Sequence, residues 1–310
     1  MRIDASMGSW RLQISIGAAT RAGIMTGRLA VGIAALLLAT VPVRAEWLAP
    51  LEAETAETLG GGSAEIGFGA SYFNDARYPP FTPRGDIKWQ SLTAVPELAF
   101  RVAPADVVEI QASYELLALD ENTISSGKQS TYGGGDARLF TKVWAVRERI
   151  WIPATGVRFG VKLPNASKSE GLGTDETDFL IQVLGSKRFG EWATHLNLGI
   201  AILGNPGFAG TSSDGQDDLF TYDIAVVSPA LGALPAEGWG LRGLFELDGA
   251  TGSRFDNDFT EVRGGPQVTW GGWTFFFGAS ANLAGAAARY GLTGGAFYRF
   301  ELESVARLFE

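Results

Sequence analysis

The sequence predicts an all-β protein, an antiparallel transmembrane β-barrel of about 12 strands (range about 10–14) that follows an N-terminal signal peptide. Three observations predict this class: an export-type apolar run near the start, short segments of alternating hydrophobicity, and connections that alternate between short and long. Composition argues against a helical membrane protein, because the 46% of hydrophobic residues are spread along the chain. A membrane helix would need stretches of roughly 20 apolar residues.

The apolar run at residues 29–41 follows Arg28 and precedes a small-residue cleavage-type sequence at residues 43–45. This combination is typical of a secretory signal peptide. We expect residues 1–45 to be a signal peptide with an upstream extension, and Met25 to be the translation start. An uncleaved anchor is the alternative, although 13 apolar residues are few for crossing a bilayer.

Removal of residues 1–45 changes the charge balance, because that segment holds five Arg and one Asp. Of 25 basic and 34 acidic side chains, 20 and 33 remain, which gives a net charge of −13. Such a chain offers no basic surface, so no nucleic-acid partner is expected. The absence of Cys fits passage through an oxidising compartment. Export of a barrel predicts a location in the outer membrane of a Gram-negative cell.

After residue 63 the chain consists of segments in which polar and apolar residues alternate. Successive side chains of a strand point to opposite faces, so alternation indicates a strand between two environments. The clearest case is residues 108–116, where odd-numbered positions are polar and even-numbered positions are mostly apolar. Reading every segment in this way predicts twelve strands, near residues 64–73, 87–102, 107–119, 135–146, 154–163, 177–188, 191–203, 218–228, 239–249, 259–270, 272–283 and 290–302.

These strands define three mature parts: residues 46–63 as a short periplasmic N-terminal segment, 64–302 as the β-barrel, and 303–310 as a C-terminal tail. Outer-membrane barrels have short periplasmic turns and longer outer loops. Short links follow even-numbered strands, at residues 103–106, 189–190 and 271–272. Long links follow odd-numbered strands, at residues 74–86, 120–134, 164–176, 204–217 and 250–258. The links at residues 147–153, 228–238 and 284–289 depart from this rule.

If the apolar positions of each strand face lipid, the alternate polar positions face the lumen. Acids and bases are mixed on that face, and two interpretations stay open. The first is a selectivity lining for small solutes. The second is a network of salt bridges that fills the barrel. The predicted lumen-lining residues are Glu97, Arg101, Glu109, Glu115, Asp136, Arg138, Lys142, Arg158, Lys162, Asp178, His195, Asn197, Asp223, Arg242, Glu246, Arg263, Arg299 and Glu301.

The sequence offers little for catalysis. His195 is the only histidine, so a barrel hydrolase would have to use it as a general base. It lies a few residues from a predicted periplasmic turn, and no Ser occupies the next position on its face, so a structural role is favoured. We therefore predict no catalytic residue, no enzyme activity, no metal site and no cofactor.

Three stretches resemble a known family. Residues 159–165 read Phe-Gly-Val-Lys-Leu-Pro-Asn, residues 171–178 read Gly-Leu-Gly-Thr-Asp-Glu-Thr-Asp, and residues 186–190 read Ser-Lys-Arg-Phe-Gly. Together with Gly134-Gly135-Asp136, they resemble the outer-membrane β-barrel family named for the MetA-pathway of phenol degradation. The resemblance covers residues 67–302. It implies an outer-membrane barrel with a role in uptake of aromatic or other hydrophobic compounds, and it supplies no catalytic motif.

We therefore expect a channel or transporter for small, aromatic or hydrophobic solutes. The alternative is a structural or surface-interaction barrel with a plugged lumen. The expected partners are outer-membrane lipid, a small solute and the barrel-assembly machinery. That machinery reads an aromatic residue at the end of many barrels, whereas this chain continues past Phe300 to Phe309-Glu310.

Overall fold

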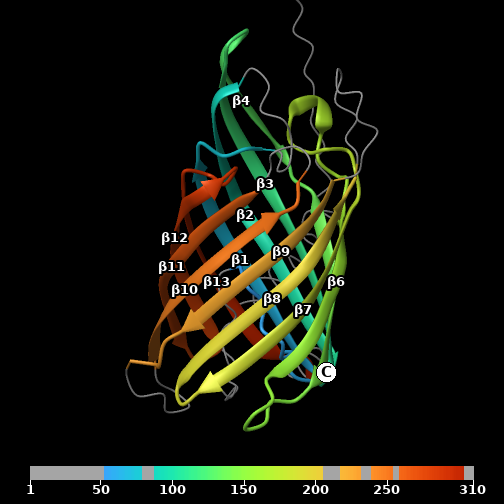
Figure 1. The fold of residues 1–310 in the computed structure, drawn as a ribbon, viewed down its shortest axis with the longest axis vertical. Coiled ribbons are helices and arrows are strands. Elements are labelled where there is room, and N and C mark those ends of the chain that lie inside the picture. Colours follow the sequence, from blue (N-terminus) through green and yellow to red (C-terminus); the bar gives the residue numbers. More distant parts are fainter. Residues whose placement is uncertain (1–51, 79–86, 205–216, 232–238, 254–257, 304–310) are drawn as a thin grey trace, which may run out of the picture. The chain divides into compact units, whose positions relative to one another are not determined.

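The computed structural model describes residues 52–78, 87–204, 217–231, 239–253 and 258–303. The predicted signal peptide and residues 304–310 of the predicted tail lie outside the described residues. Figure 1 shows that the described chain is built almost entirely of long, tilted strands. Among these residues, no helix combines the length and the apolar character that crossing a membrane requires.

The strands lie where the alternation predicts them, with one addition. Within the described ranges, one short 3-10 helix, η1 (Lys168–Glu170), interrupts the strand order. The strands are β1 (Ser63–Asn74), β2 (Ile87–Ala105), β3 (Val108–Thr123), β4 (Gly127–Gly134), β5 (Ala137–Val146), β6 (Ala154–Leu163), β7 (Asp178–Phe189), β8 (Trp192–Leu203), β9 (Asp217–Val227), β10 (Trp239–Thr251), β11 (Phe259–Trp270), β12 (Trp273–Gly285) and β13 (Tyr290–Glu301).

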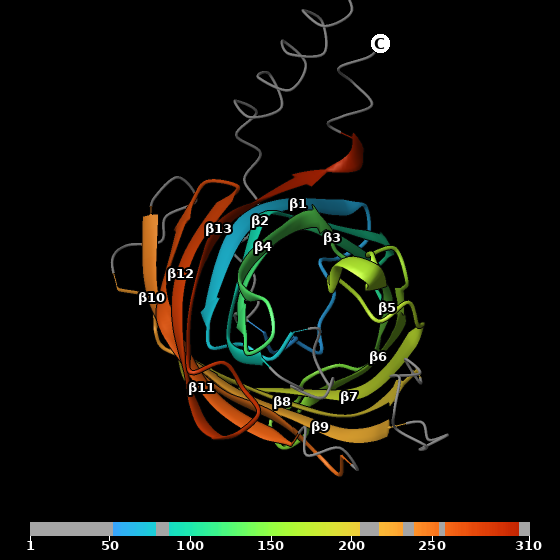
Figure 2. The same ribbon diagram turned by 90° about the horizontal axis from the view of Figure 1, so that it is seen from above.

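The strands close into one antiparallel ring (Figure 2). β1 pairs with β13 on one side and with β2 on the other, and β2 also pairs with β3, which completes the circle. β4 and β5 are two parts of one barrel strand, since both pair with β3, from Leu116↔Gly134 to Ser113↔Arg138. The barrel therefore has 12 strands, and the predicted fold class and strand number are confirmed.

The predicted link at residues 120–134 is wrong, because most of it is strand. β3 continues to Thr123, and β4 returns from Gly127 as the second arm of a hairpin. In Figure 1 this hairpin reaches above the ends of the neighbouring strands. Neither of its faces meets lipid there, so its sequence carries no hydrophobic alternation, and the pattern that located the other strands could not locate this one.

Large apolar side chains cover the outer surface of the ring. Along β7, for example, Phe179, Ile181 and Val183 are all about half exposed, whereas Leu184 on the opposite face is buried. Exposed aromatic residues stand near the periplasmic ends of the strands, including Trp192, Trp239 and Trp270. An apolar belt with aromatic side chains at its edge is the surface that a bilayer requires of a barrel.

Candidate functional site

The lumen is the candidate functional site, and a segment of the chain lies inside it. We expected residues 46–63 to form a periplasmic segment. The described part of that stretch instead enters the barrel before β1 begins, and residues 52–59 are called the inner segment below. Figure 2 shows it in blue within the ring. Ala53, Glu54 and Ala56 are buried there, so the segment is enclosed by the wall in the periplasmic half of the lumen.

The inner segment is bound by side chains of the wall. The amide of Glu54 donates to Asn197 Oδ1 at 2.7 Å, and the carbonyl of Glu54 accepts from Asn197 Nδ2 at 2.8 Å. The amide of Ala56 donates to Ser186 Oγ at 2.9 Å, and that of Leu59 to Glu109 Oε2 at 2.9 Å. Strands β3, β7 and β8 thus satisfy the backbone of the inner segment without forming a ladder with it.

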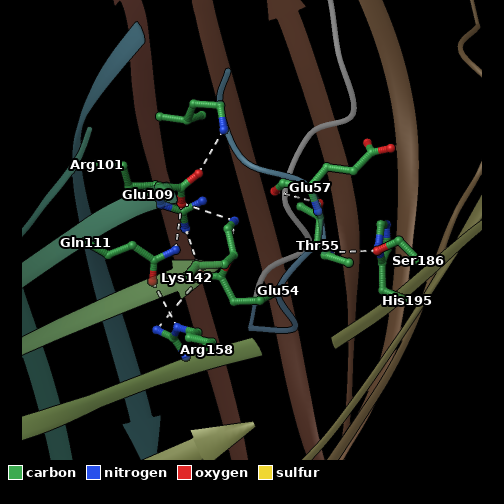
Figure 3. A network of polar contacts seen from close by, with 12 residues as sticks. Glu54, Thr55, Glu57, Arg101, Glu109, Gln111, Lys142, Arg158, Ser186 and His195 are labelled. Carbon is green, nitrogen blue, oxygen red and sulfur yellow. Dashed lines mark hydrogen bonds and ion pairs between the residues drawn. The ribbon is translucent and has the colours of Figure 1, made fainter. Parts of the chain in front are cut away.

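Three cations surround the side chain of Glu54 (Figure 3). Its carboxylate lies 3.4 Å from Arg101 Nη2, 3.3 Å from Lys142 Nζ and 3.9 Å from Arg158 Nη2. Lys142 also lies 3.1 Å from Glu109, and the side chains of both are only 1% exposed. Burial of this kind is tolerated because each charge has a partner within ion-pair distance.

This environment fixes the charge of Glu54. Burial alone would raise the pKa of its carboxyl group, but the positive charges of Arg101, Lys142 and Arg158 hold that pKa far below its ordinary value. Glu54 is therefore ionised at neutral pH, and it stays ionised in moderately acidic solution. It acts as the counter-ion of the basic wall formed by β2, β5 and β6.

The opposite wall is acidic. On β10 and β11 the carboxylates of Glu246, Asp248 and Glu261 are buried, and Arg263 is the cation beside them. Arg263 Nε lies 3.0 Å from Asp248 Oδ1, and its Nη2 contacts Glu261. Glu246 Oε2 accepts the amide of Glu52 at 2.9 Å. The inner segment thus spans the lumen, with a side chain on the basic wall and backbone amides on the acidic wall.

His195 lies under the inner segment. Its Nδ1 is 2.8 Å from Ser186 Oγ, and both side chains are buried. Ser186 Oγ also accepts the amide of Ala56, so this hydroxyl links the histidine to the inner segment. A nucleophile needs access to its substrate, and here Ala56 covers Ser186. The geometry therefore fits a structural role for His195.

A second closure lies in the outer half of the lumen. The loop at residues 164–177 folds inward, and its Leu172 is 0% exposed. Leu172 belongs to an apolar cluster with Leu92, Leu117 and Leu119, against which Phe73 packs. In Figure 2 the loop with η1 projects over the mouth of the ring from the side of β5 and β6. The outer closure is thus apolar, whereas the periplasmic closure is polar.

Lys162 holds that loop in place. Its Nζ lies 2.7 Å from Asp178 Oδ2 and 3.3 Å from Asp136 Oδ2, and it donates to Thr174 Oγ1 at 2.9 Å. Asp136 Oδ1 accepts the amide of Ala166 at 2.9 Å. These residues include the Lys-Leu-Pro, Thr-Asp and Gly-Gly-Asp stretches of the family resemblance, and their role here is to fix an inward-folded loop.

Aromatic rings line the wall formed by β1, β12 and β13. Phe276 and Phe297 stack with ring centroids 5.3 Å apart. A Cβ atom at Gly67 would lie 2.4 Å from the Phe297 ring, and one at Gly295 would lie 2.8 Å from Phe276. Glycine at these positions therefore lets each ring lie flat against the wall. The result is an apolar strip beside the polar network.

The structure brings most of the predicted lumen residues into a few groups. Around the inner segment lie Arg101, Glu109, Lys142, Arg158, His195, Asn197, Glu246 and Arg263. Nearer the outer mouth, Arg138 pairs with Glu115, Lys162 pairs with Asp136 and Asp178, and Glu97 lies opposite Glu115 in the strand register. Asp223 accepts from Gln182, Glu301 accepts from Ser63, Arg299 lies opposite Glu65, and Arg242 lies opposite Gln267.

The hydrophobic alternation did not identify two residues of the candidate site. Glu54 lies in a stretch without alternation, so nothing in the pattern placed it inside the barrel. Ser186 could have been found, because counting back from the tight β7–β8 turn pairs it with His195. In that register Ser186 lies beside His195 and supplies the hydroxyl partner that the adjacent position on β8 lacks.

Comparison with known proteins adds support for the fold. No family model and no curated protein matches the chain. An outer membrane channel from Pseudomonas putida F1 is 16% identical with a TM-score of 0.56, over 82% of this chain and 100% of that chain. The translocator domain of the autotransporter NalP from Neisseria meningitidis is 12% identical with a TM-score of 0.49, over 91% and 97%.

The first of these likenesses shows a shared barrel fold. Membership of the MetA-pathway family stays a prediction, since no family model matches. A closed barrel leaves no unpaired strand edge exposed to lipid. Its apolar exterior and ion-paired interior are those expected of a barrel that spans a bilayer. The chain is therefore a 12-stranded outer-membrane β-barrel.

Proposed function

We propose that this protein is an outer-membrane channel for small solutes, closed by its inner segment until that segment is displaced. One observation carries the proposal. In the described chain, the amides of the inner segment that reach the wall bond to side-chain oxygens, as at Ser186, Asn197 and Glu246. The wall itself is held by backbone ladders between strands. The inner segment can therefore leave the lumen while the ring of paired strands stays intact.

The contacts of the inner segment are also of a kind that water can replace. A typical hydrogen bond contributes only about 0.5–1.5 kcal/mol net, and one to a charged group about 1.5–3 kcal/mol. Once the inner segment leaves, the polar wall can be hydrated, since hydration supplies new partners to side chains such as Asn197 and Glu109. An apolar plug of similar size would instead expose its own apolar surface to water as it left the lumen.

We propose small aromatic or hydrophobic compounds as the solute class. The strip of rings supports this, because Phe276 and Phe297 offer flat apolar contacts beside the charged groups of the lumen. The family resemblance implies the same class.

We infer the barrel-assembly machinery as a folding partner, because a 12-stranded barrel must be closed within the outer membrane. Closure joins β13 to β1, where Phe300 pairs with Ala64. Phe309, the other candidate for a C-terminal recognition residue, lies outside the described residues. Replacing either phenylalanine by alanine and measuring the folded fraction in outer membranes distinguishes the two. Loss with only Phe300→Ala would place the signal in the barrel.

Planar-bilayer recordings test the channel directly. A chain that begins at residue 46 should open rarely, whereas one that begins at Gly60 should conduct steadily, because it lacks the inner segment. Heat-modifiability on a gel shows that both barrels are folded. Absence of conductance and solute flux in both chains would contradict the proposal.

A permanently plugged structural barrel is the second candidate. The observation that favours it is the buried ion pair between Lys142 and Glu109 at the level of the inner segment, which fixes charges deep in the lumen. This candidate predicts that the full-length chain never conducts and that removal of the inner segment lowers stability. The same recordings therefore separate the two functions.

A further inference from the structure

The carboxylate of Glu54 occupies a position at which three cations of the wall favour an anion. Arg101, Lys142 and Arg158 come from three different strands, β2, β5 and β6, and converge on it. Lys142 and Glu54 are both buried, so water does not shield these charges. The ligand of this site in the closed state is thus the chain's own inner segment.

The three cations differ in whether they have a second acidic partner besides Glu54. Arg101 also lies 3.8 Å from Glu65, and Lys142 also lies 3.1 Å from Glu109. Among the ion pairs of the described residues, Arg158 has Glu54 as its acidic partner. Arg158 also donates hydrogen bonds to the amide oxygens of Gln111 at 2.9 Å and Gln182 at 3.1 Å. Without Glu54, the guanidinium group of Arg158 therefore loses its ion pair.

Two aromatic rings lie beside the same cations. The guanidinium carbon of Arg158 is 3.9 Å from the centroid of Phe140, and that of Arg101 is 5.7 Å from the centroid of Phe297. Phe297 in turn stacks on Phe276. Cation–π contacts hold both guanidinium groups in position, and the ring edges supply apolar surface next to the anion position.

We propose that Arg101, Lys142 and Arg158 form a binding site for the carboxylate of a small aromatic acid, and that Glu54 occupies this site in the closed channel as an internal competitor. The inference rests on the proposed displacement of the inner segment and names the solute class more closely. A solute carboxylate restores the charge balance that departure of Glu54 removes. Its ring meets Phe140 and Phe297.

The acidic wall determines how a bound acid is oriented in the site. Glu246, Asp248 and Glu261 lie on β10 and β11, so a bound acid turns its carboxylate toward the basic wall and away from them. A neutral aromatic compound gains the ring contacts but leaves Arg158 without a charge partner. Bidentate, charge-assisted hydrogen bonds favour a carboxylate at a guanidinium group.

Binding of benzoate to the refolded chain in detergent, measured by calorimetry, tests the site. Glu54→Ala removes the competitor, and a charge-assisted contact is strong enough that benzoate affinity should rise by about tenfold or more. Benzamide, which has the same ring without the charge, should bind neither protein measurably. Benzoate binding to Glu54→Ala no tighter than to the wild type would overturn the proposal.

Two further variants locate the effect. Glu57→Ala is the matched control, because Glu57 belongs to the same inner segment but pairs with Arg188 at 3.0 Å, so benzoate binding should stay at the wild-type level. Adding Arg158→Gln to Glu54→Ala should abolish the gained affinity. If acetate bound as tightly as benzoate, the aromatic part of the proposal would be wrong.

A second measurement uses the wild-type wall and does not depend on the folding of Glu54→Ala. The chain contains no Cys, so Ala56→Cys introduces a single thiol at a buried position of the inner segment. Benzoate should accelerate its labelling several-fold and benzamide should not. An equal rate with both compounds would contradict competition with Glu54.

These readouts are independent of transport. If benzoate binds as predicted but no chain conducts, the carboxylate site stands and the channel proposal fails. If the chain lacking the inner segment conducts but benzoate does not bind, the channel stands and the carboxylate site fails.

Discussion

The two closures of the lumen use opposite chemistry. At the periplasmic half, Glu54 and the amides of the inner segment meet charged and polar side chains of the wall. At the outer half, Leu172 of the inward-folded loop packs among Leu92, Leu117 and Leu119. One closure depends on matched charges and hydrogen bonds. The other depends on apolar surface removed from water.

On the proposed channel function, the two closures set different requirements on a solute. An aromatic ring can replace the apolar contacts of Leu172, and a carboxylate can replace the carboxylate of Glu54 beside its cations. A small aromatic acid carries both groups, so it matches both closures in turn.

Lys142→Met should have the largest effect on stability. It leaves Glu54 and Glu109 buried without their shared cation, and breaking a buried pair in this way costs about 3–5 kcal/mol. Urea unfolding in micelles, followed by tryptophan fluorescence, measures the change. Lys128→Met is the matched control, because Lys128 is exposed on β4, and it should change the free energy of unfolding by less than about 0.5 kcal/mol. Equal effects of the two variants would contradict a charge-dependent closure.

Leu172→Ala should weaken the apolar closure by about 2–5 kcal/mol, the usual range for truncating a buried leucine. The loss should stay local, since Leu172 belongs to a loop and not to the ladders of the barrel. Hydrogen exchange should therefore rise in residues 164–177 and stay unchanged in β7 and β8. Exchange that rose equally around the whole barrel would show that the loop is part of the barrel's stability.

The polar closure should withstand moderate acid. Since the pKa of Glu54 lies below its ordinary value, its stabilisation is complete above the unfolded value of about 4.3 and is lost as pH falls through the lower folded value. The opening frequency in bilayer recordings should stay constant from about pH 7 to pH 5 and rise only below about pH 4. Glu54→Gln should show no such rise. A transition of the wild type near neutral pH would assign the closure to another group.

Glu148→Gln should have the smallest effect. Glu148 pairs with Lys187 at 3.0 Å and with Arg188 at 3.5 Å near the periplasmic rim, where water and salt reach the charges. Such pairs contribute about 0–1 kcal/mol. Unfolding in urea should therefore barely change. A loss of about 2 kcal/mol or more would mean that the rim network, and not only the lumen, holds the inner segment.

The sequence predicted the barrel well because lipid imposes a simple rule on it. Phe179, Ile181 and Val183 must face lipid, so their neighbours Leu180 and Gln182 face inward, and the alternation gives each strand its position. The β3–β4 hairpin was missed because it lies beyond the lipid, where this rule no longer applies.

The interior was predicted only as a list of side chains. Alternation places Lys142 and Arg158 on the inner face but does not say what they meet there. The inner segment carries no alternation and has no strand partner, so its position depends on long-range contacts such as that between Glu54 and Asn197. Local sequence patterns contain no signal for a contact of this kind.

A reversible disulfide between the inner segment and the wall tests whether the inner segment closes the channel. The amide of Ala56 lies 2.9 Å from Ser186 Oγ, so Ala56→Cys with Ser186→Cys should fix the inner segment to β7 when oxidised. We expect no conductance and no solute flux in the oxidised protein, and recovery of both on reduction. Ala193→Cys with Val227→Cys is the matched control, because these neighbours lie within the wall, and oxidation should not affect its conductance. An oxidised Ala56–Ser186 protein that conducts as well as the reduced one would contradict the claim that the inner segment closes the channel.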